Sequence, residues 1–288
     1  MNSRSHGLEE LDHLLTYVSD LDAAGTAFER LGFRLTPVSH ITTMGIANRL
    51  VLMRPRTPGA ANFIELMGVA DASRLPPPMR EVLSGSQGIK SMVMMTADAQ
   101  AAHRMLAGAG YPFVPPSHVR REWAIPGEGS VWLEFDVLLP VPAPLTFNVC
   151  QYHNVDLYVR EDWLAHPNTA RSLVAAIGVA ADAKTAVAYF ERLFGMAAVC
   201  GEDGGYVVSP GRTELVVYGA EAFEARFGVS APRAGSGVAY AGMRIAVGDL
   251  GRVAAILAGN GVPVSGASGI VVGPREACGN VIEFVKQT

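Results

Sequence analysis

A histidine and a glutamate lie in two apolar segments that have the character of β-strands. His13 lies in LDHLLTYV (residues 11–18), and Glu65 lies in NFIELMGV (residues 62–69). A carboxylate in such a segment is costly to bury unless it is paired, protonated or bound to a metal. Imidazole and carboxylate together suit zinc, iron, manganese or nickel. We expect His13 and Glu65 to be catalytic residues and ligands of one divalent metal ion, although either could instead act as a general base without a metal.

The strand period predicts which neighbours share a face with the histidine. Successive side chains of a strand point to opposite faces, so His13 is expected beside Leu15 and Tyr17, with Asp12 on the other face.

Four similar segments recur along the chain, and each predicts a short amphipathic helix. Each begins with an Asp that can accept hydrogen bonds from free N–H groups, and each ends near a Gly suited to a left-handed conformation. Apolar runs rich in strand-forming residues precede and follow each segment, so the repeating unit is βαβββ. The segments are residues 20–33, 98–111, 182–196 and 249–262.

Several short motifs resemble the vicinal oxygen chelate superfamily, and most closely its glyoxalase-like domain family. They are LDH (11–13), the helix segment 20–33, GIANRL (45–50), IEL (64–66), CQYH (150–153), HPN (166–168) and ACGNVIEFV (277–285). The resemblance implies an α+β fold in which four βαβββ units pair into two modules with curved mixed sheets. It also implies that two units together form a cup around a divalent metal. It says little about the reaction, because one scaffold can host many chemistries.

The repeats and the resemblance together predict the domain organisation. The N-terminal module is expected at residues 8–153, with units at 8–70 and 86–153. Residues 154–169 are expected to be a linker, in which HPN forms an ordered turn. The C-terminal module is expected at residues 170–288, with units at 170–220 and 236–288.

The second unit must supply the rest of the metal site, and its ligands are harder to assign. Repeat alignment places Ser91 where His13 stands, and a hydroxyl is a poor ligand for these metals. In the last strand of this unit, Gln151 matches the position of the glutamate in the C-terminal IEF segment, and His153 lies one strand repeat further. We therefore expect Gln151, His153 or both to complete the metal site. With His153 the set would be the two-His, one-carboxylate triad of non-haem iron oxygenases.

Other polar residues are candidates for substrate binding. In the segment ANRL, Arg49 could clamp a carboxylate or phosphate of the substrate with two hydrogen bonds. By strand alternation alone it could equally point outward. His40, Arg121 and Trp123 are further candidates at the mouth of the same site.

The second half of the chain has lost most of these positions. Ala175 and Gly242 stand where His13 stands, and Val216 lies near the place of Glu65, so only Glu283 survives. This half is expected to be scaffold, subunit contact or a separate pocket, with Glu283 paired to a nearby arginine such as Arg244.

Composition narrows the class of protein. The 288 residues are 49% hydrophobic and 17% charged, with a formal net charge of -4, so nucleic-acid binding is not expected. No run reaches the roughly 20 apolar residues that span a bilayer, and the N-terminus lacks the apolar core of a signal peptide. We expect a cytoplasmic protein without membrane contact, and a homodimer is an open option. The three scattered cysteines favour buried hydrophobes over a disulfide framework.

The function that these residues favour is a metal-dependent lyase or isomerase. Its substrate would be a small, oxygenated, anionic metabolite whose vicinal oxygens chelate the metal. Two alternatives stay open. One is a non-catalytic binding protein, like the antibiotic-sequestering members of the superfamily. The other is an iron-dependent extradiol-type dioxygenase.

Overall fold

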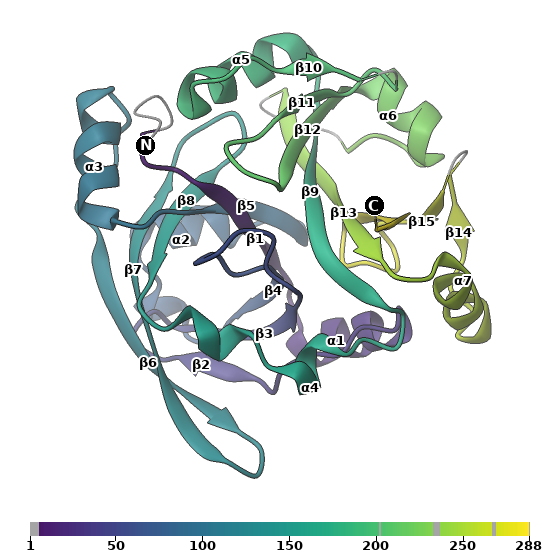
Figure 1. Cartoon of the computed structure of the whole chain (residues 1–288), viewed down its shortest axis with the longest axis horizontal. Helices are drawn as coiled ribbons and strands as arrows, with labels where there is room; N and C mark the ends of the chain where they lie inside the picture. The colour runs from purple at the N-terminus through teal and green to yellow at the C-terminus, as the bar shows by residue number, and fades with distance from the viewer. Residues whose placement is uncertain (1–5, 202, 233–236, 267–268, 288) are drawn as a thin grey trace.

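Two eight-stranded sheets follow one another along the chain (Figure 1). The computed structural model describes residues 6–201, 203–232, 237–266 and 269–287. In the first sheet the strands are ordered β2-β3-β4-β1-β5-β8-β7-β6, and in the second β10-β11-β12-β9-β13-β16-β15-β14. Because the second order repeats the first, each sheet consists of two βαβββ units joined through their first strands. The predicted α+β fold with two mixed-sheet modules is confirmed.

The strands of the first sheet lie between residues 10 and 152. They are β1 (Glu10–Tyr17), β2 (Ser39–Ile41), β3 (Ile46–Leu52), β4 (Phe63–Val69), β5 (Gly88–Met95), β6 (Ser117–Ile125), β7 (Gly129–Val141) and β8 (Phe147–Tyr152). The strands of the second sheet are β9 (Ala170–Ala180), β10 (Val199–Cys200), β11 (Tyr206–Val208), β12 (Glu214–Gly219), β13 (Val238–Val247), β14 (Val264–Ser265), β15 (Ile270–Val272) and β16 (Val281–Lys286).

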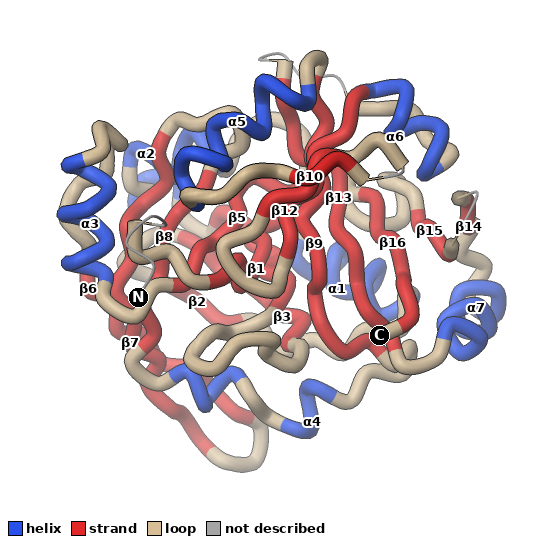
Figure 2. The backbone as a smooth tube through the Cα atoms, turned by 45° about the horizontal axis from the view of Figure 1, so that its top comes forward, coloured by secondary structure: helices blue, strands red, loops and turns tan. Residues whose placement is uncertain are grey.

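The four repeated helices begin at the predicted aspartates. In each helix the Asp side chain accepts from a backbone N–H of the first turn, which satisfies a group that has no partner within the helix. The helices are α1 (Leu21–Arg30), α3 (Ala99–Gly108), α5 (Ala183–Phe194) and α7 (Leu250–Gly259). The smaller ones are η2 (Ala72–Arg74), α2 (Pro77–Val82), η3 (Val155–Tyr158), α4 (Glu161–Leu164) and α6 (Ala220–Phe227). Figure 2 shows the strands at the centre and most helices at the periphery.

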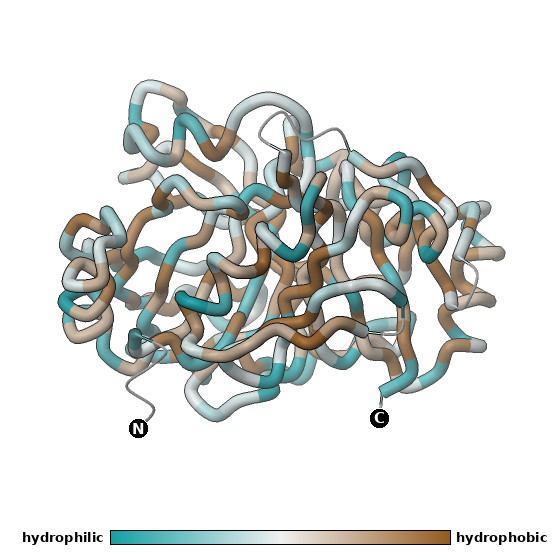
Figure 3. Tube along the Cα trace, turned by 90° about the horizontal axis from the view of Figure 1, so that it is seen from above, coloured by the Kyte–Doolittle hydropathy of each residue, from teal (hydrophilic) through white to brown (hydrophobic). Residues whose placement is uncertain are grey.

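The hydrophobic core lies between the sheets and the helices that pack on them. Hydrophobic stretches follow the central strands in Figure 3, and buried side chains of both sheets and of the four repeated helices form one large cluster. Within the described part of the chain, no helix is long and apolar enough to cross a membrane.

The segment between the modules does more than connect them. Residues 154–169 contain η3 and α4, and Tyr158 and Leu164 pack against the first sheet in a cluster with Phe63 and Trp123. The HPN turn is ordered as predicted. The His166 Nδ1 accepts from the N–H of Arg34, and its Nε2 donates to the carbonyl of Leu52. The segment therefore covers part of the first sheet and contributes to the site below.

Candidate functional site

A cavity of about 80 Å³ lies on the face of the first sheet opposite α1 and α3, with Met79 of α2 and Tyr158 of η3 in its wall. Most of its wall is apolar, with a few polar side chains among the lining residues. The lining residues, here called the pocket, are His13, Leu15, Ile41, Met44, Ile46, Leu50, Phe63, Glu65, Met67, Met79, Val93, Arg121, Phe135, Val137, Leu139, Pro140, Asn148, Cys150, Tyr152 and Tyr158.

His13 and Glu65 meet in this pocket. Both are buried, and the His13 Nε2 lies 3.9 Å from the Glu65 Oε2. The His13 ring stacks on Phe63, with 4.0 Å between ring centroids. The structure thus brings together the two residues that the sequence singled out, one from β1 and one from β4.

The orientation of His13 comes from its neighbour Asp12. The Nδ1 of His13 is in hydrogen-bond contact with the Asp12 Oδ1, and the Tyr152 Oη lies 3.2 Å from the same nitrogen. When Asp12 is ionised its carboxylate only accepts, so Nδ1 is the donor in this contact and Nε2 is the nitrogen that faces Glu65. Burial raises the pKa of Asp12, partly offset by His13.

This contact corrects the prediction that Asp12 points to the other face. The pairing of β1 with β5 shifts register between Leu11 and His13, which leaves Asp12 as the extra residue of a β-bulge. A bulge re-aims side chains that strict alternation would separate. The predicted face of Leu15 is correct, since it lines the pocket beside His13.

Glu65 is held by a residue that the sequence analysis missed. The amide of Asn48, on β3, donates from Nδ2 to the Glu65 Oε1 at 2.5 Å, and both side chains are buried. Asn48 precedes Arg49 in ANRL, and consecutive side chains of a strand point to opposite faces. Once Arg49 is assigned to the helix side, Asn48 is the residue expected on the side of Glu65.

The second unit places Asn148 at the position equivalent to Glu65. In parallel register Leu15 pairs with Glu65, and the repeat-equivalent Val93 pairs with Asn148. The Ser91 Oγ donates to the Asn148 Oδ1 at 2.8 Å, so the two counterparts of His13 and Glu65 bond to each other. The prediction that Gln151 fills the glutamate position was wrong by three residues.

Gln151 and His153 lie outside the pocket. Gln151 Oε1 accepts from the N–H of Ala99 at the start of α3, at 2.9 Å. His153 follows the end of β8, and its Nε2 lies 3.1 Å from an Asp136 carboxylate oxygen. Because Cys150 and Tyr152 line the pocket, alternation turns residues 151 and 153 to the other face. The predicted triad with His153 does not form.

Arg49 also lies on the helix side of the sheet. Its Nε donates to the Thr36 carbonyl at 3.1 Å, and its Nη2 donates to Glu29 of α1 at 3.2 Å. A Cβ built on Gly25 would lie 2.0 Å from the Arg49 guanidinium, so this glycine makes room for it. His40 is exposed and lies in a separate depression with Asp71. Neither residue lines the pocket, contrary to the expectation.

Arg121 is the arginine that lines the pocket. It is buried and donates to the Ser39 Oγ. Among the described residues no carboxylate forms an ion pair with it, and its Nε has no hydrogen-bond partner. Burial raises the pKa of the nearby Tyr158, although the Arg121 charge lowers it. Trp123 packs behind the pocket against Tyr158 and Trp163 instead of lining it.

Two further protonated groups border the pocket. Burial raises the pKa of the Cys150 thiol and of the Tyr152 phenol well above their usual values. Cys150 therefore stays a thiol at neutral pH, which makes it a poor nucleophile.

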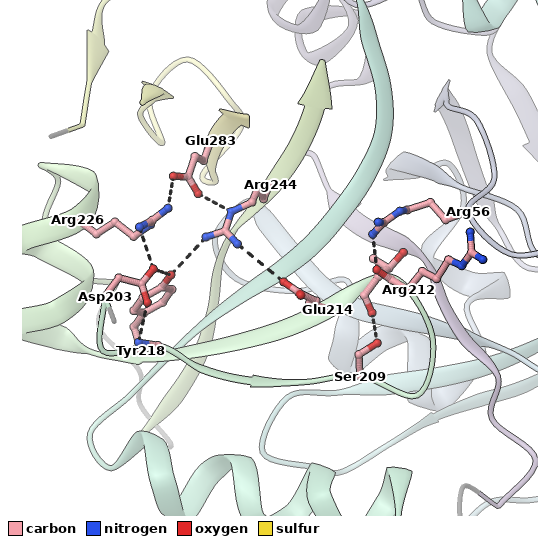
Figure 4. Close-up of polar contacts among 11 residues, drawn as sticks. Arg56, Asp203, Ser209, Arg212, Glu214, Tyr218, Arg226, Arg244 and Glu283 are labelled. Carbon is pink, nitrogen blue, oxygen red and sulfur yellow. Dashed lines mark hydrogen bonds and ion pairs between the residues drawn. The ribbon is translucent and has the colours of Figure 1, made fainter. Parts of the chain in front are cut away.

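Among the described residues of the C-terminal module, the surviving glutamate is paired with arginines. Glu283 accepts from Arg244 Nε and from Arg226 Nη2, both at 2.6 Å (Figure 4). The predicted pairing with Arg244 is confirmed. Phe223 and Phe227 of α6 pack on the sheet face that corresponds to the pocket, together with Val216. This carboxylate is buried and neutralised by two cations.

Comparisons with known proteins agree with this architecture. A family model described as a glyoxalase-like domain matches residues 11–194. A search of curated proteins found no significant match. Among solved structures, a hypothetical protein from Staphylococcus aureus matches 96% of this chain and 98% of its own, with 14% identity and a TM-score of 0.66.

Two enzymes are also among the structural matches. The E323L mutant of homoprotocatechuate 2,3-dioxygenase from Brevibacterium fuscum covers 100% of this chain and 74% of its own, with 13% identity and a TM-score of 0.55. A Streptomyces coelicolor methylmalonyl-CoA epimerase variant covers 51% of this chain and 99% of its own, with 16% identity and a TM-score of 0.39. At 14% and 13% identity, the matches to the Staphylococcus aureus protein and to the dioxygenase mutant show the fold alone. The matched family model and the fold of this chain place it in the glyoxalase-like domain family of the vicinal oxygen chelate superfamily.

Proposed function

We propose that the pocket is the active site of a lyase or isomerase that acts on a small, oxygenated, anionic metabolite. One observation carries the proposal: His13 and Glu65 line the same mostly apolar cavity as Arg121, a buried cation without a carboxylate partner in the described part of the chain. A pocket with a few convergent polar groups in an apolar wall is typical of a small-molecule site.

Arg121 would bind the anionic group of the substrate. A buried guanidinium without a counterion is costly, and a bound carboxylate supplies the missing charge and hydrogen bonds. The residue is held in place through Ser39, whose hydroxyl accepts from its Nη1. The apolar wall leaves room for a short carbon skeleton between Arg121 and the His13–Glu65 pair.

The same pair fits a divalent metal ion. The His13 Nε2 and an oxygen of Glu65 face each other at 3.9 Å, so a cation between them could be bound by both groups. Asp12 on Nδ1 is the support that metal-binding histidines usually have. His13 and Glu65 would hold the ion, with the amide oxygen of Asn148 as a weaker third donor. When bound, such an ion would stabilise an oxyanion on the substrate as a Lewis acid.

Glu65 is the residue proposed to move the proton. Asn48 holds Oε1 of its carboxylate, so Oε2, the oxygen that faces His13, is the one that would take the proton. While it acts as the base, Glu65 would not hold the ion through this oxygen. A carboxylate fixed in this way can take a proton from a carbon next to a carbonyl and return it elsewhere on the substrate.

One alternative has an observation in its favour. Ser91 and Asn148 bond to each other, so the second unit offers no strong metal ligand, and most of the wall is apolar. Both features suit a protein that binds a ligand without reaction. The dioxygenase alternative has less support, because the triad it needs includes a second histidine and His153 lies on the other face of the sheet.

Metal analysis and proton exchange would test the proposal together. We expect purified protein to lose about one equivalent of divalent metal in both His13→Ala and Glu65→Ala. Incubation in D₂O with a panel of small 2-oxo and 2-hydroxy carboxylates, followed by proton NMR, should show exchange of one C–H that Glu65→Gln abolishes. Binding of a panel compound without exchange would establish the binding protein instead. Metal content unchanged in both variants would refute the metal site.

A further inference from the structure

A second group of potential metal ligands lies on the other face of the first sheet. It consists of His118 on β6, Asp136 on β7 and His153 just after β8. The His118 Nδ1 lies 2.7 Å from one Asp136 oxygen, and the His153 Nε2 lies 3.1 Å from the other. The two imidazole rings are 5.6 Å apart, and one ligand atom from each residue lies within 4.8 Å of the others.

Strand pairing holds these three residues together. His118 pairs directly with Asp136 across β6 and β7, and Asp136 pairs with Gln151 across β7 and β8. His153 is two residues beyond Gln151, and its backbone N–H still donates to the carbonyl of Glu134. The group is therefore carried by three adjacent strands and not by a flexible loop.

This group is separate from the pocket. Phe135 and Val137, which flank Asp136, line the pocket, as does Tyr152, which precedes His153. Alternation turns Asp136 and His153 to the opposite face. An ion bound here would contact no residue that lines the pocket, but it would tie together the strands that form one of its walls.

We propose that His118, Asp136 and His153 bind a divalent transition-metal ion, of which Zn²⁺ is the best suited. Two imidazoles and a carboxylate match the ligand preference of zinc, and water would complete a four-coordinate shell. Ligand atoms around tetrahedral zinc lie about 3.4 Å apart, and the three ligand atoms here lie within 4.8 Å of one another, so side-chain rotations would bring them around one ion.

The electrostatics of the site favour a cation. Within the described residues, the ion-pair contacts of Asp136 are those to the two histidines, with no arginine or lysine among them. The nearest basic side chain along β6, Arg120, is engaged with Glu134 and lies over the Trp132 ring. The His118 side chain is 56% exposed, so an ion can enter from solvent.

Zinc titration would test this site apart from the pocket. Isothermal titration with ZnCl₂ is best done on the double variant His13→Ala, Glu65→Ala, because the pocket pair then contributes nothing. We expect one zinc per chain, and a fall in affinity of about tenfold or more when His118→Ala, Asp136→Asn or His153→Ala is added. His40→Ala, which removes an exposed histidine elsewhere, should leave the affinity unchanged.

Two further readouts keep the proposal open to refutation even if the double variant folds poorly. In the otherwise unchanged chain, His118→Ala should lose one equivalent of bound zinc. The visible absorption of bound Co²⁺ should fall in the same variant by the contribution of this site, and the fall should be absent in His40→Ala. Absence of zinc binding in the unchanged chain, or binding that His118→Ala and His153→Ala leave intact, would overturn the proposal.

Discussion

Asp12 and His13 are consecutive residues of one strand, yet their side chains are hydrogen-bonded to each other. The bulge in the pairing of β1 with β5 makes this possible. Asp12 is fully buried behind the ring, while His13 keeps its Nε2 on the pocket side. Sequence neighbours thus form a support and a functional group, and the aspartate determines which imidazole nitrogen faces Glu65.

We expect Asp12→Asn to weaken metal binding at His13 by about tenfold to hundredfold, as losses of such supporting groups do. The asparagine keeps the size of the side chain but removes its charge and can present an N–H to the ring, so Nδ1 would no longer be the protonated nitrogen. Metal affinity can be measured by competition with a chelator. Glu10→Gln, at a buried glutamate of the same strand that bonds Thr213 in the other module, is a matched control. Equal affinity of Asp12→Asn and the unchanged protein would contradict this role.

Arg121→Met should reduce the affinity for anionic ligands by about tenfold to hundredfold, the usual value of a charged hydrogen bond in a buried site. The methionine fills similar volume, so the pocket should keep its shape. Ligand-induced shifts in melting temperature with small carboxylates would report the change. Arg49→Met removes an arginine on the helix side of the same sheet and should leave those shifts intact. The assignment fails if Arg49→Met, and not Arg121→Met, abolishes them.

Glu283→Gln should destabilise the protein by about 2 kcal/mol and leave metal content unchanged. Its carboxylate neutralises Arg226 and Arg244, whose side chains are 20% and 16% exposed, and partial exposure moderates the cost of leaving them without it. Urea denaturation followed by fluorescence would measure the change in unfolding free energy. A loss of bound metal on this substitution would show that the C-terminal module has a site of its own.

The fold was predictable because the sequence contains four copies of the βαβββ unit. Each helix begins at an Asp and ends near a Gly, so one unit interpreted correctly gives the others. His13 and Glu65 were found for a similar reason, as costly polar residues in apolar strands whose repeat counterparts are mostly not ionisable.

The residues that contact His13 and Glu65 could not be predicted from the sequence pattern alone. Asp12 was assigned to the wrong face because a bulge leaves no clear mark in the sequence. Arg49 and Gln151 were misplaced because strand alternation has two phases, and one residue of slippage exchanges the faces. Asn48, which bonds Glu65, lies one residue from Arg49, and Asn148, which lines the pocket, lies three residues from Gln151. Only the strand register could decide between them.

His166 should make the protein less stable as the pH falls from about 6.5 to 4. Burial lowers the pKa of this histidine from 6.5 to about 4, and the Arg34 charge adds to this effect, while the hydrogen bond to the Leu52 carbonyl partly offsets it. Below pH 6.5 His166 binds a proton in the unfolded chain but not in the folded chain. The free energy of unfolding therefore falls by about 3 kcal/mol in total between pH 6.5 and about pH 4. His166→Gln cannot titrate and should be less stable than the unchanged protein at pH 7. Its deficit should shrink as the pH approaches 4, when both are followed by urea denaturation. Parallel stability curves for the two proteins between pH 7 and 4 would show that His166 does not titrate in this way.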